Sequence, residues 1–172
     1  MIPSDLEAEL TQHHRAAFGW ALACCWWDRA MAEDVLQTTY LKIVDGRARY
    51  AGRSAFRTWL FGVIRRTAGE ERRRRAVRRM LPLASLDGRG AARATGPDPA
   101  TAMERAEASA RLVAALRRLP ARQREVLHLV FYQELTIAEA GAVMRVSLGT
   151  ARTHYERGKT RLRALLGEGT DA

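Results

Sequence analysis

The chain has 172 residues, 47% of them hydrophobic, and a formal net charge of +10; this composition excludes a disordered tail and fits one or two folded domains. No stretch approaches the roughly 20 apolar residues that span a bilayer, and the acidic segment 1–10 lacks the basic and apolar pattern of a secretion signal. We therefore expect a cytoplasmic protein without membrane insertion.

Apolar residues at helical spacing predict a first amphipathic helix over residues 4–27. It contains the only two cysteines of the chain, Cys24 and Cys25. Neighbouring residues in a helix point about 100° apart, which is a poor geometry for a mutual disulfide or for a metal site without further ligands. Both are therefore predicted to be core thiols.

A second helix is predicted over residues 32–44, where pairs of inward-facing residues recur every four positions. We place Glu33 and Asp34 in its first turn, where the helix dipole favours negative charge. Residues 1–45 as a whole hold seven acidic and three basic residues.

A third helix is predicted to begin near Ser54, with an apolar stripe formed by Phe56, Trp59, Leu60, Val63 and Ile64. These stripe residues are expected to belong to the core. Residues 46–79 contain twelve arginines against two glutamates, so the end of the helix, residues 70–79, must face solvent or a ligand. A basic block this dense favours nucleic acid as its partner, and a basic amphipathic helix on a membrane surface is the alternative.

The second half begins with glycine, proline and small residues over 81–101, which predict a flexible linker. Helical spacing resumes over 103–116, and Pro120 starts a further helix. We find no alternating strand pattern. The predicted fold class is all-α, with two small helical domains over 1–80 and 102–172 joined by the linker.

A helix-turn-helix is predicted between residues 136 and 166. Thr136 and Glu139 have the spacing of a capping box, and Gly141 removes the side chain where a second helix must come close. Arg145 lies in the turn, where such motifs usually have Gly, because a left-handed backbone costs other residues on the order of 1 kcal/mol. Ser147 is expected to cap the second helix.

The second helix of this motif is predicted to face inward through Ala151, Tyr155, Gly158, Leu162 and Leu165. Its outer face then carries Arg152, Thr153, Glu156, Arg157 and Lys159. A helix in this position reads the DNA major groove, where Arg bonds guanine bidentately. The alternative is a helical hairpin whose basic face is only solvated.

Five segments together resemble the extracytoplasmic-function (ECF) group of the sigma-70 family of bacterial RNA polymerase subunits. They are AEDVLQ (32–37), FRTWL (56–60), SLD (85–87), LPARQREVL (119–127) and GTAR (149–152). The resemblance covers nearly the whole chain in family order. It implies sigma region 2 over 1–80, sigma region 4 over 102–172, and a protein that binds core RNA polymerase and directs it to promoter DNA.

The resemblance also implies roles for individual residues. The second helix corresponds to the surface that docks on the polymerase clamp, which assigns polymerase binding to Glu33, Asp34 and Gln37. Opening of the minus-10 promoter element needs arginines for phosphates and an aromatic surface for an unstacked base, roles assigned to Arg49, Tyr50, Arg53, Arg57 and Arg66. Residues 72–75 either extend this phosphate track or form a solvated charge run.

Recognition of the minus-35 element is assigned by the resemblance to Arg152, Thr153, Glu156 and Arg157, with Ser147 and Thr150 near the DNA backbone. The chain departs from the family pattern at Thr67, Glu70, Ala151 and Glu156. Glu156 can accept from cytosine N4 and cannot donate to guanine, which bears on the promoter sequence and not on the mechanism. An anti-sigma factor that clamps regions 2 and 4 is a further implied partner.

Other classes of protein share some of these sequence features. Residues 122–166 also resemble the DNA-binding domain of LuxR-type regulators, which have no use for the first three helices, and a sigma-like decoy that titrates an anti-sigma factor is a second alternative. An enzyme is not expected, because the sequence shows no phosphate-binding glycine loop and no catalytic residue. We predict no cofactor, no metal and no small-molecule substrate.

The four histidines show no metal-ligand spacing. His13 and His14 are expected to be an exposed or half-buried pair, and His128 to lie on the flank of its helix.

Overall fold

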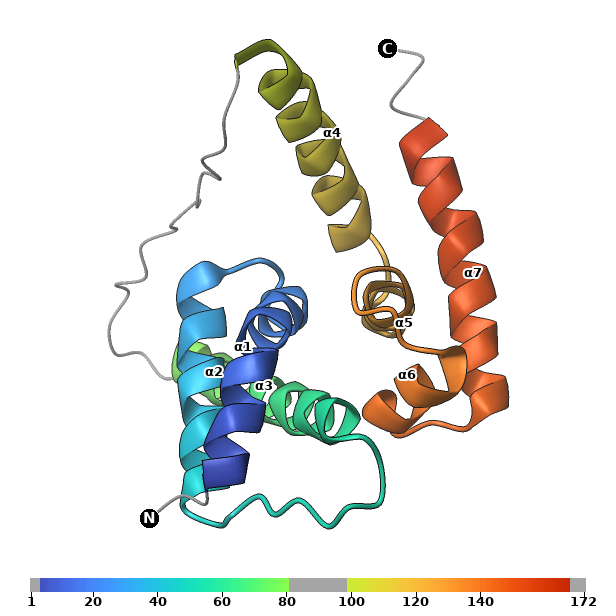
Figure 1. Ribbon diagram of the computed structural model, residues 1–172. Helices are drawn as coiled ribbons and strands as arrows, with labels where there is room; N and C mark the ends of the chain where they lie inside the picture. The colour runs from blue at the N-terminus through green and yellow to red at the C-terminus, as the bar shows by residue number, and fades with distance from the viewer. Residues whose placement is uncertain (1–3, 81–98, 168–172) are drawn as a thin grey trace. The chain divides into compact units, whose positions relative to one another are not determined.

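The computed structural model describes residues 4–80 and 99–167, which form seven α-helices and no strand (Figure 1). The predicted all-α class is confirmed. Contacts between Cα atoms divide the chain into two compact units. The first contains the helices α1, α2 and α3, and the second contains α4, α5, α7 and most of α6.

In the first unit, α1 (Ser4–Cys24) ends three residues before the predicted boundary. Trp26 and Trp27 both adopt a left-handed backbone, with φ angles of +59° and +61°, which turns the chain sharply. The left-handed conformation is energetically unfavourable for residues other than Gly, so a Trp-Trp pair in the sequence does not predict a turn of this kind. The corner leads directly to the next helix.

The second helix, α2 (Arg29–Val44), begins three residues earlier than predicted because Asp28 is its N-cap. The Asp28 carboxylate accepts a hydrogen bond of 2.9 Å from the backbone N–H of Met31, which satisfies a donor that the helix start leaves unpaired. Glu33 and Asp34 therefore lie in the second turn, and their prediction in the first turn was wrong.

The core of this unit lies where α1, α2 and α3 (Phe56–Met80) pack pairwise against one another. Trp20 is fully buried, and its indole N–H donates to the carbonyl of Phe61 across the α1–α3 contact at 2.9 Å. Cys24 and Cys25 are buried and neither forms a disulfide, as predicted, and burial raises the pKa of Cys25 to about 12.

The second unit contains α4 (Pro99–Arg117), α5 (Ala121–Phe131), α7 (Leu148–Gly167) and residues 137–141 of α6 (Ile137–Met144). Of the predicted linker, residues 81–98 lie outside the described residues, and the last three are already the start of α4. The main helix contact of the second unit is between α5 and α7, and a smaller contact joins α4 to α7.

The contact between α5 and α7 is close because Gly158 has no side chain. A Cβ atom at Gly158 would lie 3.2 Å from Leu127 Cδ1 and 3.3 Å from the carbonyl oxygen of Gln123. The contact buries Val126, Leu127 and Leu129 of α5.

His128 differs from its prediction, since it is only 6% exposed and does not lie on the flank of α5. Its ring stacks almost parallel on Tyr132, with 5.1 Å between the centroids. The amide nitrogen of Gln133, another buried side chain, lies 3.3 Å from His128 Nε2. Burial lowers the pKa of His128 to about 4, because the interior disfavours the charged imidazolium.

Candidate functional site

The predicted polymerase-docking residues share one exposed face of α2. Glu33, Asp34 and Gln37 are all exposed, whereas the opposite face buries the stripe Met31, Ala32, Val35, Leu36, Thr39 and Ile43. Arg29 forms an ion pair of 2.8 Å with Glu33 one turn later. The three residues can therefore reach a partner without disturbing the core.

A groove of about 370 Å³ borders this face between α1 and α2. It is lined by Glu33, Gln37 and Leu36 together with His14, Phe18, Arg29 and Tyr40. The Tyr40 hydroxyl lies 3.0 Å from His14 Nδ1, and burial raises the Tyr40 pKa to about 12. Glu33 and Gln37, two of the three predicted docking residues, thus line a groove that also contains apolar side chains.

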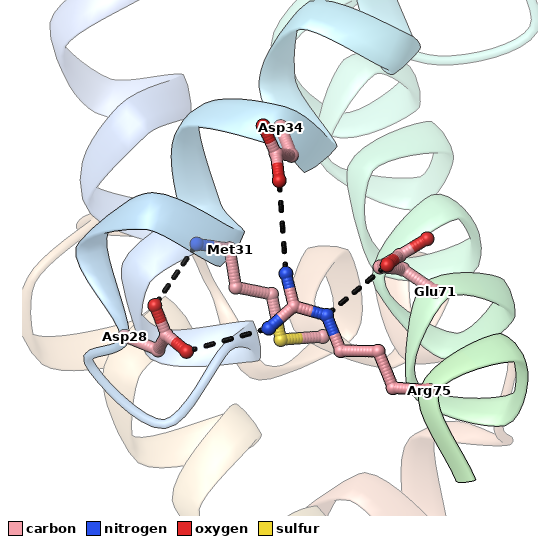
Figure 2. A network of polar contacts seen from close by, with 5 residues as sticks. All are labelled: Asp28, Met31, Asp34, Glu71 and Arg75. Carbon is pink, nitrogen blue, oxygen red and sulfur yellow. Dashed lines mark hydrogen bonds and ion pairs between the residues drawn. The ribbon is translucent and has the colours of Figure 1, made fainter. Parts of the chain in front are cut away.

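The arginines at residues 72–75 do not behave as one run. Arg72 donates to the carbonyl oxygen of Cys24 at 2.7 Å, and Arg75 contacts three carboxylates (Figure 2). Arg73 and Arg74 are exposed. Arg72 and Arg75 are therefore half-buried and held by other residues of the unit, so a solvated run does not describe them, while the phosphate track stays a prediction.

An aromatic cluster lies at the start of α3 and in the loop before it. The ring of Tyr50 is 5.3 Å from the rings of both Phe56 and Trp59, and its hydroxyl donates to the carbonyl oxygen of Ser54. Phe56 is buried, as predicted, but Trp59 is half-buried and Tyr50 is 41% exposed. The cluster offers an exposed aromatic surface supported from below, which suits stacking of an unpaired base.

The arginines predicted for the minus-10 element differ in their exposure. Arg49, Arg53 and Arg66 are exposed, and Arg49 Nε donates to the carbonyl oxygen of Gly46 at 3.2 Å. Arg57 is half-buried, with its guanidinium 5.5 Å from the centre of the Phe61 ring. Arg57 is thus the least accessible of the four to a phosphate.

Two of the departures from the family pattern are joined in space. Lys42 on α2 donates to the Thr67 hydroxyl at 3.2 Å and forms an ion pair with Glu70 on α3. A Thr and a Glu at these positions hold the Lys42 ammonium between the two helices.

The helix-turn-helix has the predicted local construction. The Thr136 hydroxyl accepts from the backbone N–H of Glu139, and the Glu139 carboxylate accepts from the N–H of Thr136, which completes the capping box. Ser147 caps α7 by accepting from the N–H of Thr150 at 3.2 Å. Arg145 has a φ of +56°, the left-handed conformation predicted for the turn.

Gly141 lies where the two helices of the motif approach. A Cβ atom there would be 3.2 Å from the carbonyl oxygen of Val146 and 3.3 Å from Ala151 Cβ.

All six residues predicted for the minus-35 element are exposed: Ser147, Thr150, Arg152, Thr153, Glu156 and Arg157. Several are already engaged within α7. The Ser147 and Thr150 hydroxyls bond each other at 2.9 Å, and Thr153 donates to the carbonyl oxygen of Gly149. Glu156 pairs with Lys159 at 3.2 Å. Arg152 and Arg157 are therefore the best placed cations of this face for DNA.

The described residues contain no cluster of three or more metal-ligating side chains. None of the helices in residues 4–80 and 99–167 combines the length and apolar character that a membrane span requires.

Comparison with known proteins agrees with both units. Residues 10–78 match the family model for Sigma-70 region 2, and residues 115–164 match that for Sigma-70, region 4. RNA polymerase sigma factor CarQ of Myxococcus xanthus is 32% identical over 139 residues, which are 81% of this chain and 76% of CarQ. ECF RNA polymerase sigma factor SigF of Caulobacter vibrioides is 34% identical over 125 residues, 73% of this chain and 65% of SigF.

Solved structures show the same fold. The sigma factor RpoE from Bartonella quintana, solved in complex with the anti-sigma factor NepR, matches with a TM-score of 0.76 at 22% identity, over 96% of this chain and 98% of that one. CnrH in complex with the cytosolic domain of CnrY matches with a TM-score of 0.62 at 22% identity, over 96% and 88%. The chain therefore belongs to the ECF group of the sigma-70 family, the RNA polymerase subunits that direct transcription initiation at promoters.

Proposed function

We propose that this sigma factor works in the cytoplasm without catalytic activity of its own, with residues 1–80 acting as region 2 and residues 102–172 as region 4. The observation that carries this proposal is the exposed polar face of α2, formed by Glu33, Asp34 and Gln37. A regulator that only binds DNA has no use for such a face, whereas a polymerase subunit requires a docking surface.

Promoter capture is divided between two surfaces in this proposal. The exposed Tyr50 ring, with Trp59 beside it, would stack an unpaired base of the minus-10 element, while Arg49, Arg53 and Arg66 contact phosphates. The outer face of α7 would read the minus-35 element in the major groove.

An anti-sigma factor is the regulatory partner that we propose. Two proteins with the same fold, RpoE and CnrH, were solved with NepR and with the cytosolic domain of CnrY, respectively. The groove between α1 and α2 borders the docking face, so a partner bound there would block polymerase. Regulation would then come from outside the chain.

The docking assignment is tested by charge reversal. Asp34→Lys combined with Gln37→Ala should weaken binding to core RNA polymerase and lower transcript yield in vitro, because both side chains are exposed and the core is unaffected. Glu7→Lys, a charge reversal at an exposed position of α1, is the matched control and should bind normally. Unchanged affinity of the double variant, with helicity retained by circular dichroism, would contradict the assignment.

A further inference from the structure

Arg75, in the second half of α3, is surrounded by three carboxylates from two helices and a cap (Figure 2). Its Nε donates to Glu71 at 3.1 Å, while Nη1 lies 3.5 Å from Asp28 and Nη2 lies 3.6 Å from Asp34. The Arg75 side chain is 23% exposed, and that of Glu71 is 19% exposed. This is a part-buried network, in which ion pairs are screened less than on an open surface.

The network connects the end of α3 to the docking helix at two points. Asp28 uses one carboxylate oxygen to cap α2 and the other to face Arg75, so the guanidinium is linked to the start of that helix. Asp34 lies on the docking face, and its side chain remains 67% exposed. One guanidinium thus faces three carboxylates, and of these only Asp34 lies on the docking face.

We propose that Arg75 is a positioning residue for polymerase docking and not a DNA contact, an inference that rests on the proposed docking role of Asp34. Arg75 offsets the repulsion among the three carboxylates, which lets Asp34 and the capped start of α2 keep one geometry before polymerase arrives. Because the Asp34 side chain is the most exposed of the three, Asp34 can turn to a cation of the partner while Glu71 and Asp28 retain Arg75.

The alternative role, phosphate binding with the rest of the basic run, fits Arg75 poorly. A phosphate contact would require its guanidinium to leave three carboxylates, whereas Arg73, two residues away, is already exposed. The two arginines share charge, helix and sequence neighbourhood, and differ in their contacts, so Arg73 is the matched control.

The test measures equilibrium binding of the full chain to core RNA polymerase by fluorescence anisotropy. Arg75→Gln should weaken binding roughly tenfold, an order-of-magnitude value for a part-buried charged contact, while Arg73→Gln should stay within about twofold. Glu70→Gln is the comparator for a purely structural effect, because it breaks the other α2–α3 ion pair, Lys42–Glu70. It should also leave polymerase affinity within about twofold.

Four outcomes would decide the matter. Equal losses of polymerase affinity for Arg75→Gln and Arg73→Gln would overturn the proposal. It would also be overturned if Glu70→Gln and Arg75→Gln each lost polymerase affinity in the same proportion to their fall in melting temperature, because the effect would then be purely structural. In a double-mutant cycle, Asp34→Asn and Arg75→Gln should be non-additive, and strict additivity would also overturn it. If Asp34→Asn alone has no effect, the proposed docking function itself fails, which separates that failure from one confined to Arg75.

Discussion

Protonation of His128 should destabilise the second unit at mildly acidic pH. The pKa of this buried imidazole is lowered to about 4, against an ordinary value of 6.5, so the unfolded chain binds the proton more tightly than the folded one. Stability is therefore present above pH 6.5 and is lost as the pH falls toward 4. Linkage gives a loss of about 2 kcal/mol in the free energy of unfolding between pH 7 and pH 5.

The assay is thermal unfolding of the full chain, followed by far-ultraviolet circular dichroism from pH 7 to pH 5. A loss of this size should lower the melting temperature of a unit of this length by on the order of 10 °C. His128→Phe keeps an aromatic ring against Tyr132 and removes the titration, so the difference from wild type isolates the His128 contribution. His154→Asn is the control and should keep the full fall.

The reasoning would be refuted if wild type and His128→Phe lost stability in parallel over this pH range. Proton resonances of the His128 ring that titrate near pH 6.5 would refute it independently.

Two further predictions concern packing and DNA reading. Gly62→Ala should raise the free energy of unfolding by about 1 kcal/mol, because a Cβ atom at this position meets nothing within 4 Å. Gly141→Val should lower the free energy of unfolding by about 1 to 3 kcal/mol, because a side chain there meets Val146 and Ala151. Urea titrations with unchanged midpoints would contradict both predictions. Arg152→Ala should cost about 1 to 3 kcal/mol of binding energy and relax the preference at one base pair of the minus-35 element. Arg157→Ala should reduce initiation from all promoters to a similar extent. A promoter library randomised at the minus-35 element tests this, and identical profiles for the two variants would contradict it.

The helix-turn-helix could be predicted in detail because its determinants are local. The capping box joins residues three apart, and the left-handed turn at Arg145 lies at the position where such motifs usually have Gly. Physical rules that act within one helical turn are visible in a sequence without knowledge of the fold. The exposure of the α7 outer face followed from the same helical periodicity.

The fate of the arginine run could not be predicted in this way. Twelve arginines in one block look alike until packing of α3 against α1 and α2 decides which of them meets a carbonyl or a carboxylate. The spacing of Glu71 and Arg75, four residues apart, was the one available signal for a local ion pair. The early start of α2 had a local signal that the prediction did not use, the capping carboxylate of Asp28.

His128 shows a third limit. Its place on the flank of α5 was predicted from the sequence of that helix alone. A single helix gives the direction of a side chain but not how completely neighbouring residues cover it. The ring of Tyr132 and the amide of Gln133, which follow α5, lie against His128 and contribute to its burial.

The burial of Trp20 between α1 and α3 has an optical consequence. All four tryptophans of the chain, at positions 20, 26, 27 and 59, lie in the first unit, and the second has none. Excitation at the red edge of indole absorption therefore produces fluorescence from the first unit and none from the second. A partner that alters the surroundings of these indoles would change this emission, whereas the acid transition of His128 would leave it unchanged, so tryptophan emission reports on the first unit alone without any label.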